Sequence, residues 1–217
     1  MSGPGETLRV SEIFHSIQGE STRVGLPTTF VRLTGCPLRC VWCDTEYAFA
    51  GGEIVSLAEI QARIDAIGCP NVCVTGGEPL AQKACLALLK SLCDAGYSVS
   101  LETSGALDIA DVDARVSRIV DLKAPDSGEA EKNRWTNIDL LTARDEIKLV
   151  LASPADYQWA KQMLVQHRLA ERCPVLFSPV AGRLDPAALA EWILRDKLPV
   201  RFQLQLHKVI WGSERGR

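Results

Sequence analysis

Short β-branched runs alternate with longer amphipathic segments along this chain, and this alternation is the main constraint on its fold. The short runs occupy residues 29–33, 72–75, 98–102, 118–122, 146–151, 175–178 and 201–206. Segments with helical periodicity occupy residues 56–67, 81–95, 154–169 and 186–196. Strands that alternate with helices in this way predict a parallel sheet with right-handed crossovers.

The length of the chain limits how far such a sheet can close. A complete eight-fold barrel needs about 250 residues, and this chain has 217. We therefore predict an α/β fold: a partial, open TIM-type barrel of parallel strands, with fewer helices than a full (β/α)8 barrel. We expect one domain that spans residues 1–217, with a loop at residues 124–137. In such folds the functional site lies at the carboxyl ends of the strands.

Charge and hydropathy exclude several classes of protein. The formal net charge is -3, so the chain lacks the basic surface that binds nucleic acid or an anionic membrane. No apolar run approaches the roughly 20 residues that span a bilayer, and residues 1–9 lack the apolar centre of a signal peptide. We therefore predict a cytoplasmic protein.

Three of the eight cysteines form the pattern C-x3-C-x2-C: Cys36, Cys40 and Cys43. Three thiols this close suit a bound metal rather than a disulfide framework. Structural zinc requires four protein ligands, and no fourth ligand is near. A 4Fe-4S cluster held by three cysteines has one iron free for a cofactor, so the pattern favours the cluster over zinc or a plain turn. The other cysteines are predicted to be buried apolar side chains: Cys69, Cys73, Cys85, Cys93 and Cys173.

A second motif, Gly76-Gly77-Glu78-Pro79, follows the apolar run 72–75. Two glycines let backbone approach a ligand closely, and Glu78 can accept hydrogen bonds from an ammonium group. Alone, the motif could be an ordinary strand-to-helix turn with Pro79 at the first helical position. Together, the two motifs resemble the radical S-adenosylmethionine superfamily, which implies that S-adenosylmethionine binds the free iron of the cluster.

Further segments narrow this resemblance: residues 12–20, 30–33, 43–45, 101–105 and 205–208. Over about residues 9–211, the chain resembles the 7-carboxy-7-deazaguanine synthase family. The resemblance implies conversion of 6-carboxy-5,6,7,8-tetrahydropterin to 7-carboxy-7-deazaguanine with loss of ammonia, on the route to queuosine. It also implies Mg2+, an electron donor such as a flavodoxin or ferredoxin, and a homodimer.

The resemblance also implies roles for individual residues. Arg32 offers a guanidinium fork for a substrate carboxylate, and Thr103 offers a hydroxyl. Thr45 is the implied magnesium ligand. The implied substrate contacts also include Ile17, Gln18, Gly19, Glu20 and His207. The implied contacts with S-adenosylmethionine are Trp42, Cys43, Asp44, Gly76, Gly77, Glu78, Ser104, Gly105, Lys123, Ser178 and Pro179. No residue is assigned as catalytic.

Structural alternatives stay open for several of these residues. Arg32 could form a buried ion pair, and Asp44-Thr45 an Asx-type turn. Residues 103–105 could serve only the turn, and His207 could be a buried histidine with satisfied hydrogen bonds. Two other functions also stay open: an activase that makes a glycyl radical on a partner protein, and a zinc-binding module without catalysis.

Overall fold

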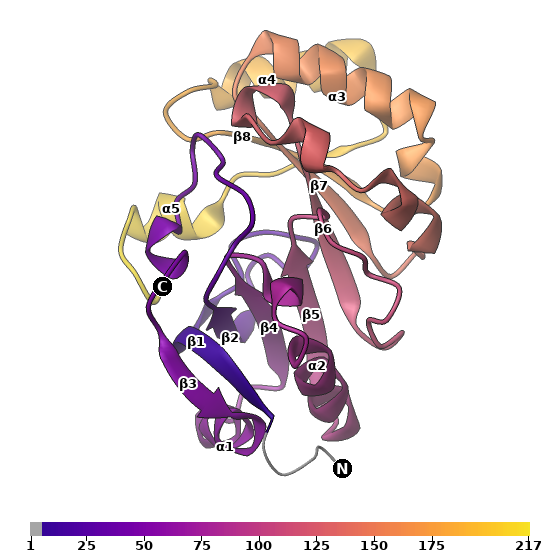
Figure 1. Cartoon of the computed structure of the whole chain (residues 1–217). Coiled ribbons are helices and arrows are strands. Elements are labelled where there is room, and N and C mark those ends of the chain that lie inside the picture. The colour runs from indigo at the N-terminus through magenta and orange to yellow at the C-terminus, as the bar shows by residue number, and fades with distance from the viewer. Residues whose placement is uncertain (1–5) are drawn as a thin grey trace.

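The strands form one open sheet in the computed structural model, which describes residues 6–217. The predictions for the N-terminal segment also cover residues 1–5, which lie outside the described residues. The sheet has the order β3-β1-β2-β4-β5-β6-β7-β8-β9 (Figure 1). The strands are β1 (Thr7–Ile17), β2 (Pro27–Leu33), β3 (Glu53–Ser56), β4 (Asn71–Gly76), β5 (Ser98–Thr103), β6 (Ser117–Lys123), β7 (Glu146–Leu151), β8 (Val175–Pro179) and β9 (Arg201–Phe202).

The pairing confirms the predicted α/β fold with an open sheet. From β2 to β9 every neighbouring pair is parallel, whereas β1 pairs antiparallel with both β2 and β3. The two edge strands, β3 and β9, do not pair with each other, so the barrel is not closed. The carboxyl ends of the parallel strands therefore meet along one edge, where a site is expected.

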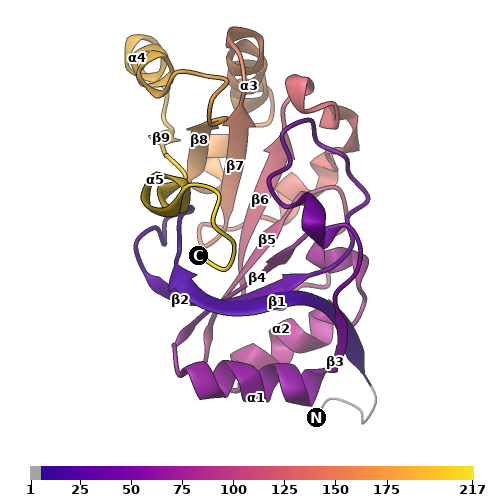
Figure 2. The same cartoon turned by 90° about the vertical axis from the view of Figure 1, so that its left-hand side faces the viewer.

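Within residues 6–217, five α-helices connect or follow these strands. They are α1 (Leu57–Ile67), α2 (Cys85–Asp94), α3 (Pro154–Gln166), α4 (Pro186–Asp196) and α5 (Leu206–Trp211). Ser56 and Ser153 cap α1 and α3, since their side chains accept hydrogen bonds from Glu59 N and Asp156 N. Figure 2 shows α1 and α2 near one end of the sheet, α3 and α4 near the other, and α5 with the chain end between them.

The strands divide their side chains between two faces, because successive residues point in opposite directions. In β6, Val120 and Leu122 lie in the hydrophobic core, with Leu149 and Leu151 of β7. The opposite face of the same strands carries Asp121, Lys123 and Lys148, which line a cavity. The apolar face packs the helices, and the other face is free to build a site.

Several elements differ from the sequence-based prediction. β1 and β3 were not expected, because β1 mixes charged and apolar residues and most of it is only partly buried. The predicted strand 201–206 ends at Phe202, since the side chain of Gln203 exchanges hydrogen bonds with the backbone of Ser21. The predicted loop 124–137 contains short 3-10 turns.

The helix predicted at residues 81–95 begins four residues later, at Cys85. Gln82 has an extended conformation, and its side-chain amide pairs with the backbone N and O of Arg9 at 2.8 and 2.9 Å. This pairing competes with a continuous helix. Among the described residues, no helix has the length and apolar character to span a membrane.

Candidate active site

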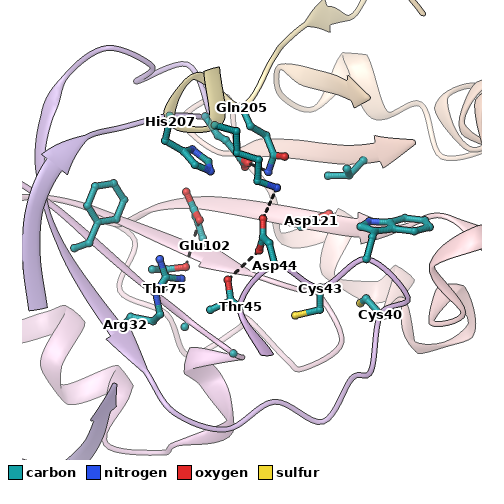
Figure 3. A pocket seen from close by; sticks show the side chains of 18 of the residues that line it. Arg32, Cys40, Cys43, Asp44, Thr45, Thr75, Glu102, Asp121, Gln205 and His207 are labelled. Carbon is teal, nitrogen blue, oxygen red and sulfur yellow. Dashed lines mark hydrogen bonds and ion pairs between the residues drawn. The ribbon is translucent and has the colours of Figure 1, made fainter. Parts of the chain in front are cut away.

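A cavity of about 630 Å³ opens on the polar face of the sheet, at the carboxyl ends of the strands. The three cysteines of the C-x3-C-x2-C motif line one part of it. In Figure 3, Cys40 and Cys43 lie at one side of the cavity, and Gln205 and His207 lie across it. Arg32 and Glu102 line the same space. One cavity therefore joins thiols to a set of charged and amide groups.

The cysteine loop follows β2 and is held by backbone contacts from several elements. Gly35 N donates to Ala48 O at 2.7 Å, and Val41 N donates to Ser127 O at 3.0 Å. Arg39 N donates to the carboxylate of Glu129 at 2.6 Å. These bonds leave the side chains of the loop free to face the cavity.

The three thiols suit the cluster predicted from their spacing. All three are free and partly exposed, and they line the cavity. Burial raises the pKa of each thiol, and the nearby ammonium of Lys123 opposes this effect. Three features fit an iron–sulfur cluster. Lys123 is a cation that favours the thiolate form, the sulfurs are soft donors, and the cavity leaves open space beside them.

The described residues do not favour the zinc alternative. No group of three or more Cys, His, Asp or Glu side chains within residues 6–217 is placed to hold a single metal ion. In a cubane cluster each thiolate binds a different iron, so the sulfurs need not converge on one point. The remaining cysteines behave as predicted: Cys69, Cys73, Cys85 and Cys173 are buried and Cys93 is partly buried, all of them free.

The Gly76-Gly77-Glu78-Pro79 turn packs directly against the cysteine loop. A Cβ on Gly77 would lie 2.3 Å from the carbonyl oxygen of Gly35, and one on Gly76 would lie 2.3 Å from that of Leu33. Glu78 N also donates to Gly35 O at 2.7 Å. The two glycines are therefore required by the close approach of two backbone segments, and both still line the cavity.

The carboxylate of Glu78 is fully buried and does not line the cavity. It accepts hydrogen bonds from Thr103 Oγ1 at 2.9 Å, and from Ser104 N and Leu80 N at 2.7 and 3.0 Å. A contact between this side chain and the ammonium of a cofactor, as predicted, would require these bonds to break. The hydroxyl of Thr103 therefore donates to Glu78, which agrees with the structural alternative in which residues 103–105 serve the turn.

Arg32 combines a partly buried ion pair with a place in the cavity wall. Its Nε lies 2.7 Å from Glu12 Oε1, which also accepts a hydrogen bond from Tyr47 Oη at 2.7 Å. No hydrogen bond from NH1 or NH2 is found within the described part of the chain. The terminal nitrogens can therefore serve a ligand carboxylate, while Glu12 orients the guanidinium.

Asp44 and Thr45 lie beside the cysteines in the cavity. Thr45 Oγ1 donates to Asp44 Oδ1 at 2.9 Å, and Lys208 Nζ lies 2.5 Å from Asp44 Oδ2. Burial disfavours the charge of Asp44, but Lys208 outweighs burial and lowers the pKa of Asp44 to about 2. This carboxylate is ionised at neutral pH, which places an oxygen donor next to Thr45.

His207 and Gly19 meet on the opposite wall. A Cβ on Gly19 would lie 2.0 Å from His207 Nδ1, and Leu206 N donates to Gly19 O at 2.9 Å. Burial lowers the pKa of His207, so its imidazole is neutral at pH 7. This contact joins α5 to the turn after β1 and places both residues at the cavity.

Most residues predicted from the sequence line this one cavity. The exceptions are Glu78, Gly105, Ser178 and Pro179; in the β8 region, Val180, Ala181 and Arg183 line it instead. Three further residues that line the cavity were not predicted from the sequence: Glu102, Asp121 and Lys148. The signal for each was a charged residue beside an apolar one within a predicted strand, and Glu102 also lies in the segment 101–105 that supported the family resemblance. Residues 212–217 match no motif and had no predicted role, yet all six line the cavity.

Comparisons with known proteins agree with this geometry. A model of the Radical SAM superfamily matches residues 30–166. The 7-carboxy-7-deazaguanine synthase of Chlorobaculum tepidum is 50% identical over 210 residues, which cover 95% of this chain and 96% of that protein. That of Koribacter versatilis is 43% identical over 95% of this chain and 98% of its own length.

Solved structures share the fold. The crystal structure of QueE from Escherichia coli superimposes with a TM-score of 0.77 at 23% identity, covering 93% of this chain and 95% of that one. Streptococcus suis SuiB bound to S-adenosylmethionine superimposes with a TM-score of 0.55 at 12% identity, covering 78% of this chain and 44% of that one.

The open sheet and the superfamily match define a radical S-adenosylmethionine enzyme, whose cofactors are a 4Fe-4S cluster and S-adenosylmethionine. Identity over nearly the whole chain defines the family more closely. This chain belongs to the 7-carboxy-7-deazaguanine synthases.

Proposed function

We propose that this chain converts 6-carboxy-5,6,7,8-tetrahydropterin to 7-carboxy-7-deazaguanine with release of ammonia. The observation that carries the proposal is the single cavity that joins three thiols to Arg32 and to several carboxylates, of which Glu20 is buried. When bound, the cluster and S-adenosylmethionine supply a carbon-centred radical that abstracts hydrogen. The protein contributes binding, orientation and exclusion of water.

The thiol end of the cavity is the proposed cofactor site. Cys36, Cys40 and Cys43 would hold the cluster, and Lys123 would compensate their negative charge. S-adenosylmethionine would lie beside them. Its proposed contacts are Trp42, Asp44, Ser104 and the backbone of Gly76 and Gly77, all of which line the cavity.

The opposite end is the proposed pterin site. Arg32 would bind the substrate carboxylate through its terminal nitrogens, since Nε is engaged with Glu12. Glu20 and Gln18 would pair with the polar ring edge of the substrate, and His207 would close this end as a neutral donor or acceptor. Because these groups come from the turn after β1, from β2 and from α5, the substrate would tie distant parts of the chain together.

The proposal is tested by anaerobic reconstitution with reductant, S-adenosylmethionine, Mg2+ and the carboxytetrahydropterin. We expect 7-carboxy-7-deazaguanine, detected by mass spectrometry. A Cys40→Ser variant should bind less iron and yield no product, whereas Cys85→Ser, a buried position outside the cavity, should retain iron. Formation of 5′-deoxyadenosine without 7-carboxy-7-deazaguanine would show that the substrate is wrong.

Thr45 is the proposed protein ligand of Mg2+, with the hydroxyl that the hard ion prefers. Thr45→Ala should raise the Mg2+ concentration needed for half-maximal rate, and Thr45→Ser, which keeps the hydroxyl, should not. An unchanged Mg2+ dependence in Thr45→Ala would remove this residue from the site.

We further propose that residues 1–217 act as one domain, since all nine described strands share one sheet. A cytoplasmic location remains a proposal from the charge and hydropathy of the sequence, and a homodimer and a flavodoxin or ferredoxin as electron donor remain proposals from the family resemblance. Reduction of the reconstituted protein by each donor, followed by 5′-deoxyadenosine formation, would test the last of these.

A further inference from the structure

Lys148 is a buried lysine in the wall of the cavity and has no assigned role. It lies in the middle of β7, between apolar neighbours, and its side chain is 9% exposed. The register of the parallel pair β6–β7 sets it beside Asp121, with Nζ 3.4 Å from Asp121 Oδ2. Its shortest contact is a hydrogen bond to Glu20 Oε2, across 128 residues of sequence.

Glu20 is the residue whose ionisation depends most on Lys148. Its carboxylate lies in the cavity wall and is 8% exposed. Its other oxygen, Oε1, accepts a hydrogen bond from Gln205 Nε2 at 2.5 Å. An ionised carboxylate without a cation at such a depth is strongly destabilising. Lys148 is therefore the group that allows Glu20 to be charged inside the cavity.

A second carboxylate nearby behaves differently. Glu102 accepts a hydrogen bond from Thr75 Oγ1 at 3.3 Å (Figure 3). It accepts a second from Gln18 Nε2 at 3.2 Å. Burial raises the pKa of Glu102, with a further contribution from the charge of Glu20. Burial also acts on Glu20, but Lys148 and Gln205 outweigh it and lower its pKa. The two carboxylates therefore differ in their tendency to ionise.

The charged groups around Glu20 come from four elements, one of which is β5 with Glu102. Lys148 contacts it from β7, and Asp121 and Lys123 of β6 complete a chain of ion pairs behind that lysine. His207 on α5 faces Glu20 from the other side, and its own pKa is lowered by burial. At neutral pH, Lys148 is consequently the cation in direct contact with Glu20.

We propose that Lys148 is a positioning residue for substrate binding: it keeps Glu20 charged and oriented, so that Glu20 can accept hydrogen bonds from the N–H edge of a bound pterin. Lys148 acts through Glu20 and does not contact the reacting atoms. This inference rests on the proposed function, since it names the group that prepares the pterin end of the cavity.

Lys148→Met tests the proposal, because methionine keeps the length of the side chain and removes its charge. A hydrogen bond to a charged group contributes enough that its loss should raise KM and the pterin dissociation constant by roughly 10- to 100-fold. The dissociation constant is measured by calorimetry without turnover. Iron content after reconstitution, which depends on the cysteine loop, should stay as in the parent protein. Lys148→Arg should recover part of the affinity.

The pH dependence gives a second readout. Without Lys148, burial should raise the pKa of Glu20, so KM of Lys148→Met should increase as pH falls from 8 towards about 5. The parent protein should show a weaker increase. Lys90→Met is the matched control, because Lys90 forms an exposed ion pair with Asp94 on α2 and should alter neither KM nor its pH profile.

A double-mutant cycle separates positioning from a direct contact. If Lys148 acts through Glu20, then Lys148→Met should add little to the KM of Glu20→Gln. The double variant removes both charges, so this comparison holds even where the single Lys148→Met variant folds poorly. Additive effects, or an unchanged pterin affinity in a folded Lys148→Met, would overturn the proposal. Failure of the parent protein to form 7-carboxy-7-deazaguanine would instead refute the proposed function.

Discussion

Replacing Gly77 with alanine tests whether the glycine turn and the cysteine loop form one structural unit. A Cβ at this position would lie 2.3 Å from Gly35 O and 2.8 Å from Cys36 Cβ, whereas ordinary contact begins at 3.4 Å. The first contact is with backbone, so a rotamer change cannot relieve it. The two segments must separate by about 1 Å, which would break the hydrogen bond from Glu78 N to Gly35 O.

The size of the effect follows from these two losses. Overpacking of a close contact costs about 1–3 kcal/mol, and a lost backbone hydrogen bond costs about 1 kcal/mol. We therefore expect Gly77→Ala to lower the free energy of unfolding by about 2–4 kcal/mol. For a chain of this length the corresponding fall in Tm is roughly 4–16 °C. Because Cys36 moves with Gly35, cluster binding should fall as well.

The assay combines thermal unfolding by circular dichroism with iron and sulfide content after anaerobic reconstitution. Gly68→Ala is the control, because Gly68 ends α1 at a φ of 72° and a Cβ there meets nothing within 4 Å. Its left-handed conformation should cost about 1–2 kcal/mol, with full iron binding. A Gly77→Ala protein with the parent Tm and iron content would refute the argument.

Three further predictions concern other parts of the chain. Gly19→Ala should displace His207, since the added Cβ would lie 2.0 Å from Nδ1, and kcat/KM should fall by about 100-fold; parent kinetics would contradict this. Asp145→Asn should lower the free energy of unfolding by about 3–5 kcal/mol at pH 7, because it breaks the buried ion pair with Arg118 at 2.6 Å. Burial opposes ionisation of Asp145, but hydrogen bonds from Arg118 and Thr142 lower its pKa below 3.8. The difference in free energy of unfolding between the parent protein and Asp145→Asn, measured with urea, should therefore persist above pH 3.8. It should shrink as the pH falls through the lower pKa of the folded state. Removal of residues 213–217 takes away Arg215, whose guanidinium lies 4.1 Å from the Tyr47 ring, and should raise KM by about 2- to 30-fold without loss of iron; an unchanged KM would show that the chain end does not contribute to binding.

The sequence allowed much of the fold to be predicted because short runs rich in β-branched and aliphatic residues alternate with helical segments. The segments that became β2 and β4 to β8 have this character and were found within one or two residues at each end. β1 was missed because it mixes charged and apolar residues, and β9 was predicted too long because Gln203 turns back to bond with Ser21. These failures involve contacts between segments far apart in the chain.

The sequence by itself determined the chemistry of the thiol end, since the three cysteines are close in the chain and their spacing has few interpretations. Only the tertiary structure decided the pterin end. Side-chain alternation on β6 and β7 points Asp121 and Lys148 to the cavity, and chain folding brings Glu20 to Lys148 across 128 residues. The tertiary structure also turned the Glu78 carboxylate away from the cavity. Local motifs specify which atoms are available, whereas the direction of each side chain depends on packing between distant segments.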